Sequence, residues 1–287
     1  MKPAPFSYHR AATAEEAVSL LSELGDEAKL LAGGQSLVAM MNFRLARPSA
    51  LVDISRIDAL RYIAHEDDGL RIGAMARHCD FERLDDPRIL SDFPVLSRAA
   101  RLIGHYVIRS SGTFGGSLAH ADPAAEWCMI ALLLDAEITI LGPSGKRMVP
   151  AREFFKGFLE TDLGYDEMII EVRLPVARPN TGFQEFARRH GDFAVVAAGV
   201  TLDVEDGRVV EPRVVLGGVG GMVLRSEAAE ESLAGAPVDD ATFAAAAGAA
   251  AADINPPPDL QGSPEYRRHL ASVLVRRALE EATADVA

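Results

Sequence analysis

Two segments of the chain each place a pair of adjacent glycines beside hydroxyl or amide side chains. Residues 32–36 read Ala-Gly-Gly-Gln-Ser and directly follow an apolar run, and residues 113–117 read Thr-Phe-Gly-Gly-Ser. Glycine allows the backbone to take positive φ values and to approach a ligand closely. Successive N–H groups in such a turn can hold an anion, and neighbouring hydroxyl groups can add hydrogen bonds. Two turns of this kind can enclose a pyrophosphate from both sides without a lysine.

Neither glycine turn matches a common phosphate-binding motif. The sequence has no GxxxxGK(S/T) segment and no GxGxxG after its first apolar strand. Taken singly, each glycine pair is most simply a plain turn; taken together, with their flanking residues, the two favour a binding site. Ser36 lacks the second glycine of the GxSxG turn of hydrolases, so the interpretation as a hydrolase is weak.

Metal binding is a further interpretation that the sequence does not favour. The segment His78-Cys79-Asp80 lacks two further ligands at a suitable spacing. His105, His120 and Asp122 could meet near the second glycine turn, but polar loop residues beside a cofactor account for them more simply than a metal ion. We therefore predict no metal site.

Residues 1–55 predict a β/α/β arrangement built around the first glycine turn. Residues 13–16 form a capping-box pattern, and apolar residues at helical spacing then continue to Gly25. Residues 29–32 predict a short buried strand that leads into the turn, residues 37–45 a helix and residues 50–54 a second strand.

The rest of the chain predicts two further groups of elements. Strands are expected over residues 70–73, 136–141, 147–149 and 168–174, with a turn at 142–145, and helices over 95–103 and 124–134. Beyond Pro175 and Pro179, strands are expected over 182–189, 194–204 and 209–216, with a hairpin turn at Asp206-Gly207. Helices follow over 243–252 and from Ser263, which is a good N-cap before Pro264.

Charge and cysteine content exclude several classes of function. The net charge of −13 argues against a nucleic-acid or anionic-membrane surface. Two cysteines, Cys79 and Cys128, are too few for an iron–sulfur cluster held by four thiolates, and we expect both to be buried apolar groups. The N-terminal residues lack the apolar stretch of a signal peptide, and no run reaches the length of a membrane span, so a cytoplasmic location is expected.

Four segments carry a resemblance to a known family. Residues 32–48 with 51–54, residues 108–123, residues 188–194 and residues 216–225 resemble, in order and spacing, segments of the FAD-binding medium subunit of the xanthine dehydrogenase and carbon monoxide dehydrogenase (molybdenum hydroxylase) family. The resemblance spans nearly the whole chain. It implies an α+β fold with a two-subdomain FAD-binding domain of the vanillyl-alcohol-oxidase (PCMH) type over residues 1–177, divided into 1–57 and 58–177. A smaller C-terminal α+β domain, with a short antiparallel sheet and helices, would cover residues 178–287.

The resemblance also implies which residues bind FAD non-covalently. The first loop would surround the pyrophosphate, and the second would contact the phosphates and the ribityl chain from the other side. Glu126 stands where relatives usually have Asp, Gln184 where several have lysine, and Phe193 where many have tyrosine beside the flavin. The implied cofactor-binding residues are Leu31, Ala32, Gly33, Gly34, Gln35, Ser36, Leu37, Val38, Thr113, Phe114, Gly115, Gly116, Ser117, Glu126, Ile169, Gln184 and Phe193.

The function implied by the resemblance is electron transfer within a multi-subunit oxidoreductase. A large partner subunit would hold the molybdenum cofactor and oxidise the substrate, and a small partner subunit would hold two [2Fe-2S] clusters. This chain would pass electrons from those clusters through FAD to an external acceptor, with no catalytic acid or base of the usual kind. The assembly would be a heterotrimer or its dimer. Its substrate remains open among carbon monoxide, aldehydes, purines and other N-heterocycles, as does its electron acceptor.

Two other interpretations use the same fold. A free-standing flavin reductase would need its own substrate pocket and a proton donor opposite the flavin, and the sequence identifies neither. A scaffold that has lost FAD is disfavoured because both loops keep their glycines and hydroxyl groups.

Overall fold

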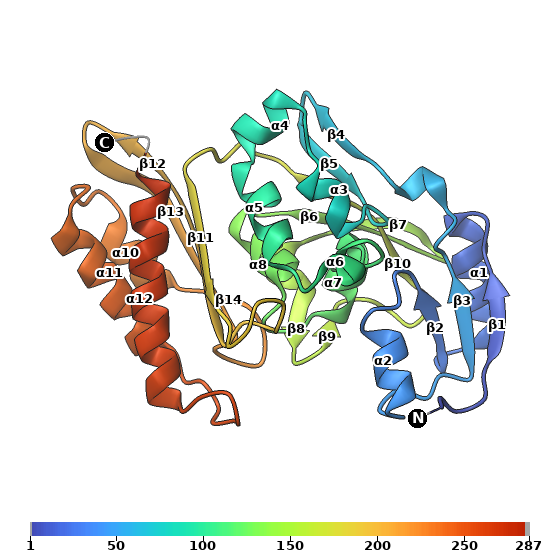
Figure 1. Ribbon diagram of the computed structural model, residues 1–287. Helices are drawn as coiled ribbons and strands as arrows, with labels where there is room; N and C mark the ends of the chain where they lie inside the picture. Colours follow the sequence, from blue (N-terminus) through green and yellow to red (C-terminus); the bar gives the residue numbers. More distant parts are fainter. Residues whose placement is uncertain (1, 285–287) are drawn as a thin grey trace.

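The N-terminal part of the chain forms a three-stranded parallel sheet in the computed structural model, which describes residues 2–284 (Figure 1). Its elements are β1 (Ser7–Arg10), α1 (Ala14–Leu24), β2 (Ala28–Leu31), α2 (Leu37–Asn42) and β3 (Ala50–Asp53). The strand β3 lies between β1 and β2. Thr13 Oγ1 accepts a hydrogen bond from Glu16 N at 3.1 Å, and the Glu16 carboxylate accepts one from Ala12 N at 2.7 Å, a close variant of the predicted capping box.

A five-stranded antiparallel sheet forms the centre of the molecule. Its strands are β4 (Ile63–Glu66), β5 (Gly69–Gly73), β6 (Glu137–Gly142), β7 (Gly145–Pro150) and β10 (Met168–Leu174). They lie in the order β4-β5-β10-β6-β7, so β10 returns to the middle of the sheet after the hairpin of β6 and β7. The predicted turn at residues 142–145 is confirmed, whereas β1 and β4 were not predicted.

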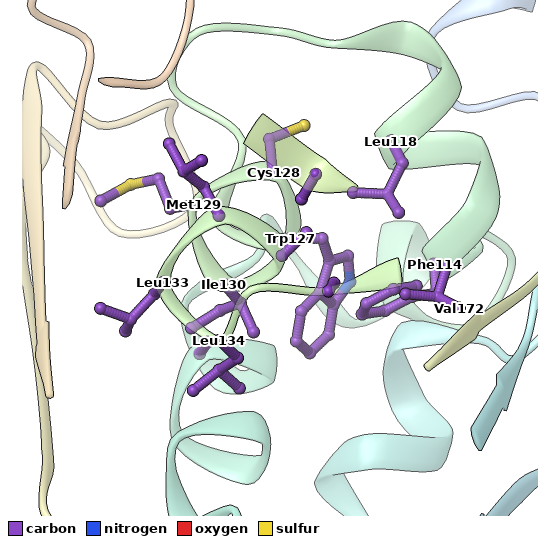
Figure 2. Close-up of a cluster of buried hydrophobic side chains, with 14 of the residues drawn as sticks. Phe114, Leu118, Trp127, Cys128, Met129, Ile130, Leu133, Leu134 and Val172 are labelled. Carbon is purple, nitrogen blue, oxygen red and sulfur yellow. The ribbon is translucent and has the colours of Figure 1, made fainter. Parts of the chain in front are cut away.

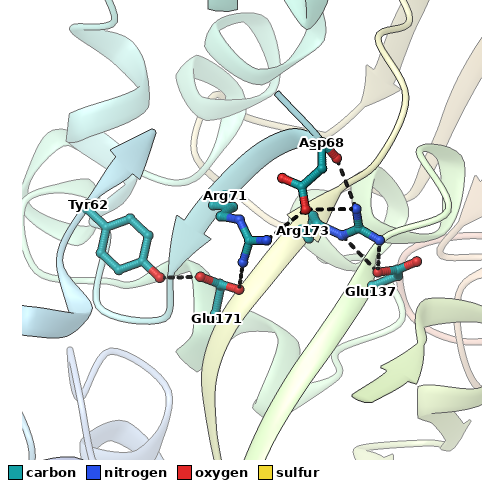
Figure 3. A network of polar contacts seen from close by, with 6 residues as sticks. All are labelled: Tyr62, Asp68, Arg71, Glu137, Glu171 and Arg173. Carbon is teal, nitrogen blue, oxygen red and sulfur yellow. Dashed lines mark hydrogen bonds and ion pairs between the residues drawn. The ribbon is translucent and has the colours of Figure 1, made fainter. Parts of the chain in front are cut away.

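Polar side chains cross-link the outer face of this central sheet (Figure 3). Glu171 on β10 accepts hydrogen bonds from Tyr62 Oη at 2.6 Å and from Arg71 Nη1 at 2.8 Å. Arg173, two residues further along β10, pairs with Glu137 on β6 and with Asp68 in the β4–β5 turn. Single exposed ion pairs add little stability, but this network joins three neighbouring strands, β5, β10 and β6.

Short helices and one hairpin connect and cover the central sheet. They are η1 (Asp58–Leu60), α3 (His78–Glu82), α4 (Pro87–Asp92), α5 (Pro94–Leu102), α6 (Tyr106–Arg109), α7 (Phe114–His120), α8 (Glu126–Leu133) and α9 (Ala151–Phe154), with the hairpin β8 (Phe155–Gly157) and β9 (Glu160–Thr161). Every residue of α8 is buried. The helices expected over 95–103 and 124–134 are found as α5 and α8.

The C-terminal part of the chain forms a four-stranded antiparallel sheet covered by three helices. Its elements are β11 (Thr181–Phe186), β12 (Val196–Glu205), β13 (Arg208–Gly217), β14 (Leu224–Arg225), α10 (Glu227–Leu233), α11 (Asp240–Asp253) and α12 (Pro264–Ala282). The predicted hairpin turn at Asp206-Gly207 and the N-cap Ser263 are confirmed. Helix α12 packs on β11 and β12, and α8 approaches the sheet along β12 and β13 (Figure 1). The α+β architecture expected from the resemblance is confirmed.

The apolar core is divided into three clusters that meet at the sheets. The largest surrounds α8, where Trp127 packs against Phe114 (Figure 2). Trp127 also packs against Phe81. A second lies between the C-terminal sheet and its helices. The third covers the N-terminal sheet and extends into the central sheet through Leu141, Met168 and Ile170. Within residues 2–284, no helix has both the length and the apolar character needed to cross a bilayer.

Replacing Trp127 with Ala should lower the free energy of unfolding by about 3–5 kcal/mol, because the indole is fully buried and its removal leaves a large cavity. Trp127→Phe should cost less, since it keeps most of the packing but loses the 2.8 Å hydrogen bond from Nε1 to His78 Nδ1. Denaturant unfolding followed by circular dichroism measures both. Phe158→Ala is the control, because Phe158 is 69% exposed, and an equal loss in the control would contradict the prediction.

Candidate functional site

A deep cleft opens between the N-terminal sheet and the central part of the molecule. Its volume is about 670 Å³, within the range of roughly 300–1,000 Å³ that is usual for pockets that bind small molecules and cofactors. Four of the segments that line it are the first glycine turn, the second glycine turn with the start of α7, the chain from β9 into β10, and the loop before β12. The cleft thus joins parts of the chain that lie far apart in the sequence.

The first glycine turn presents a row of free backbone donors. It connects the C-terminal end of β2 to α2, and Gly34 takes a left-handed conformation with φ 70° that favours glycine. Among the hydrogen bonds within residues 2–284, none uses the N–H groups of residues 33–37. Ser36 stands at the N-cap position of α2, yet its hydroxyl makes no capping bond there. Five adjacent amides and a hydroxyl are therefore available to an anion.

The two glycine turns touch each other through bare backbone. A Cβ atom on Gly33 would lie 2.2 Å from the carbonyl oxygen of Ser111 and 2.8 Å from the Cα of Gly112. Since real Cβ atoms do not approach this closely, only glycine fits at position 33. A Cβ on Gly116 would come to 3.8 Å from the Cβ of Ala32, so Gly116 lies beside the first turn, whereas Gly115 lies against Ala74. The predicted approach of the two turns is confirmed.

The second glycine turn differs from the expected one, because its amides are already used. Gly115 and Gly116 lie in the first turn of α7, where the Thr113 hydroxyl caps the helix by accepting from Gly116 N at 3.1 Å. The N–H groups of Phe114, Gly115 and Ser117 donate to the carbonyls of Ala76, Ala74 and Thr113. The expectation that both turns offer free N–H groups is therefore wrong for the second turn. That turn contributes the hydroxyl groups of Thr113 and Ser117, and glycines that leave the surface of the cleft without side chains.

Thirteen of the seventeen predicted site residues line the cleft. They are Ala32, Gly33, Gly34, Gln35, Ser36, Leu37, Thr113, Gly115, Gly116, Ser117, Glu126, Ile169 and Phe193. They come from the first turn, α7, the start of α8, β10 and the loop before β12, so the fold brings them together.

Four predicted residues lie elsewhere. Leu31 and Val38 face a smaller hollow on the outer side of the first turn. Phe114 (Figure 2) is fully buried in the core. Its ring packs on Phe81. Gln184 does not line the cleft; its amide donates to Glu281 on α12 at 3.0 Å. None of these four side chains lines the main cleft.

Several residues of the cleft were not among the predicted site residues. His78, at the start of α3, accepts a hydrogen bond from buried Trp127, and burial lowers the pKa of its imidazole to about 4. Lys29, on β2, and Tyr165, before β10, also line the cleft. No sequence signal marks them, because they reach the cleft through the pairing of distant elements. Within residues 2–284, the structure holds no group of three or more side chains suited to a metal ion.

The donor set fits a dinucleotide that carries a diphosphate. Backbone amides and hydroxyl groups can hold an anion without a cluster of lysines or arginines. Among the described residues that line the cleft, Lys29 is the one lysine, and there is no arginine. The walls are mainly apolar along Ile54, Ile103 and Ile169, as suits a flat ring system. The residues present therefore fit FAD.

Comparisons with known proteins cover both halves of the chain. Residues 4–177 match the family described as the FAD binding domain in molybdopterin dehydrogenase, and residues 181–282 match the CO dehydrogenase flavoprotein C-terminal domain. The chain is 41% identical to the 6-hydroxypseudooxynicotine dehydrogenase complex subunit alpha of Paenarthrobacter nicotinovorans, over 98% of this chain and 96% of the relative. It is 37% identical to the carbon monoxide dehydrogenase medium chain of Hydrogenophaga pseudoflava, over 99% of each.

Two solved structures are similar to this chain over nearly its whole length. A chain of carbon monoxide dehydrogenase from Hydrogenophaga pseudoflava superposes with a TM-score of 0.94 at 38% identity, covering 99% of both chains. A chain of quinoline 2-oxidoreductase from Pseudomonas putida 86 gives 0.93 at 35% identity and covers 100% of both.

Gly33→Ala should weaken FAD binding strongly, by about tenfold or more, because the added methyl group pushes the first turn away from Ser111 and misplaces the free amides. Quenching of flavin fluorescence on titration with the protein measures the dissociation constant. Gly248→Ala is the matched control, since Gly248 lies in α11 and a Cβ there meets nothing within 4 Å. Unchanged affinity in Gly33→Ala would contradict the proposed role of the turn.

Proposed function

The chain belongs to the family of FAD-binding medium subunits of molybdenum-containing dehydrogenases, and on this premise we propose that it transfers electrons inside such an enzyme. The electrons would come from iron–sulfur clusters on a small partner subunit and would leave for an external acceptor. Substrate oxidation would occur at the molybdenum cofactor of a large partner subunit. When bound, FAD supplies a carrier that exchanges electrons singly or in pairs.

One observation supports the proposal most directly: the free amides of residues 33–37 and the glycines of α7 belong to segments that line the same cleft. In this proposal the amides and the Ser36 hydroxyl hold the diphosphate, and Thr113 and Ser117 add hydroxyl groups from the other side. Ile169 and Phe193 border the part of the cleft that would take the ring system. Leu31, Val38 and Phe114 support the two turns, and Gln184 acts only through β11 and α12.

Cysteine content and the relatives support a division of labour among chains. Two cysteines, both buried and free, cannot supply the four thiolates that a [2Fe-2S] cluster usually takes. The relatives are named as a subunit or as a medium chain. We therefore propose a heterotrimer or its dimer, with residues 1–177 as the FAD-binding domain and 178–287 as the C-terminal domain.

The purified chain should bind one FAD, and the native assembly should contain molybdenum, iron and two further polypeptides. Affinity purification from the source cells, followed by metal analysis and the flavin absorption spectrum, tests both statements. The isolated chain, mixed with FAD and NADH, should show no substrate turnover of its own. A colourless chain that takes up no FAD would refute the proposal, and rapid turnover by the isolated chain would favour a free-standing flavin reductase.

A further inference from the structure

The chain that leaves α2 exposes apolar side chains that the rest of the fold does not cover. Phe43 is 65% exposed and Leu45 is 76% exposed, and they lie two residues apart at the edge of the molecule (Figure 1). Single exposed apolar residues are normal on protein surfaces, whereas grouped ones mark a surface that another molecule buries. We call residues 43–47 the α2 patch.

The turn that ends α2 is a Schellman motif with two unusual residues. Leu45 N donates to Met40 O and Arg44 N donates to Met41 O, each at 2.9 Å. Arg44 takes a left-handed φ of 58° at the position that usually belongs to glycine. The apolar residue after it commonly packs back on the helix, but Leu45 stays mostly exposed. The motif therefore keeps a cation and an apolar side chain at the surface, at a cost in local stability.

The α2 patch is cationic in a strongly acidic chain. Residues 28–52 contain Lys29, Arg44 and Arg47 and no aspartate or glutamate, whereas the whole chain has a net charge of −13. Arg44 Nε donates to Lys2 O at 3.3 Å and Arg47 Nε to Arg44 O at 3.1 Å. Among the described residues, both guanidinium groups thus contact carbonyl oxygens and pair with no carboxylate. Two cations in this state suit an acidic partner surface, because opposite charges guide encounter and disfavour wrong partners.

The α2 patch borders the cleft that is proposed to hold FAD. Leu37 and Met40 of α2 and Ala46 of the patch line this cleft. Phe43 and Leu45 do not line it, so they are available to a molecule outside it. A small electron acceptor needs a concave pocket around it, whereas side chains on the outer surface suit the broad surface of another polypeptide. A protein bound on the patch would lie beside the edge of the cleft.

We propose that the α2 patch docks the partner chain that carries the iron–sulfur clusters, through a partner surface with an apolar centre and acidic residues around it. The inference rests on the proposed function of this chain in electron transfer. Phe43 and Leu45 bury apolar area at the centre of the contact. Arg44 and Arg47 pair with carboxylates at its rim. A second copy of this chain fits less well, because two identical patches would bring like charges together.

Cysteine labelling tests whether a partner covers the α2 patch. Both native cysteines are buried, so a cysteine added at the surface is the site that a maleimide reagent reaches first. In Leu45→Cys, the new thiol should react in the isolated chain and lose most of its reactivity in the purified native assembly. Leu260→Cys is the matched control, because Leu260 is 97% exposed and lies in the C-terminal part of the chain. Its thiol should react in both states.

Photochemical cross-linking identifies which chain lies on the patch. Phe43→p-benzoylphenylalanine keeps an aromatic side chain and forms a covalent bond to its neighbour on illumination. In the purified native assembly, the cross-linked product should contain the iron-carrying polypeptide, as identified by mass spectrometry.

Charge reversal tests the cationic rim. Arg44→Glu combined with Arg47→Glu should raise the dissociation constant of this chain from its assembly about tenfold or more, because attractive pairs become repulsive ones. Dilution of the purified assembly, followed by mass photometry, measures this constant. Arg208→Glu makes the same kind of change at an exposed position at the start of β13 and should leave the constant unchanged.

Arg44→Gly separates docking from a merely structural role. Glycine tolerates the left-handed φ, so the unfolding midpoint of the isolated chain should not fall, while the assembly should dissociate more readily. A merely structural role for Arg44 would give the reverse result, with a lower midpoint and an unchanged assembly.

The outcomes distinguish this inference from the proposed function. If the thiol of Leu45→Cys reacts equally in both states, or if the cross-link joins a second copy or the molybdenum-carrying chain, the inference is overturned and the FAD site stands. If the chain binds no FAD, or if its native assembly contains no iron, the proposed function itself fails. Flavin fluorescence titrations of the isolated variants confirm that each still binds FAD.

Discussion

The contact between Gly33 and the backbone of Ser111 determines how the two halves of the cleft meet. A Cβ added at position 33 would lie only 2.2 Å from that carbonyl oxygen, so any larger residue there would separate the turns. One turn is placed by β2 of the N-terminal sheet and the other by α7 beside the central sheet. The parallel pairing of β2 with β3 and the packing of Phe114 on Trp127 therefore both serve the same close approach. The binding site is a property of two sheets held in register, and neither turn forms it alone.

Binding an anion with amides agrees with the charge of the chain. A net charge of −13 gives no long-range attraction for a diphosphate, so short-range donors in a concave site must provide the affinity. In the proposed site, the free amides of residues 33–37 would do this without a cluster of cations.

Local patterns in the sequence predicted the parts of the fold that depend on near neighbours. The caps at Thr13 and Ser263 and the hairpin at Asp206-Gly207 each follow from a few adjacent residues. Strand β1 was missed because its residues are mostly exposed and pair with β3, 43 residues away in sequence. Likewise, the used amides of α7 depend on acceptors at Ala74 and Ala76, and Gln184 meets Glu281 near the other end of the chain. Because these partners are far apart in the sequence, a pattern of a few adjacent residues cannot predict them.

The third apolar cluster has a consequence for the order in which the molecule assembles. The N-terminal sheet and α1 share an apolar cluster with Leu141 of β6 and with Met168 and Ile170 of β10, which are made much later than β3. A nascent chain that has emerged only as far as β3 has its parallel strands and α1 but lacks the later residues that complete this cluster. During synthesis, the apolar cluster beside the first glycine turn therefore stays incomplete until β10 has been made, when more than half of the polypeptide has left the ribosome. The nucleotide site is among the last features of this region to mature, although the sequence that begins it is among the first to be translated.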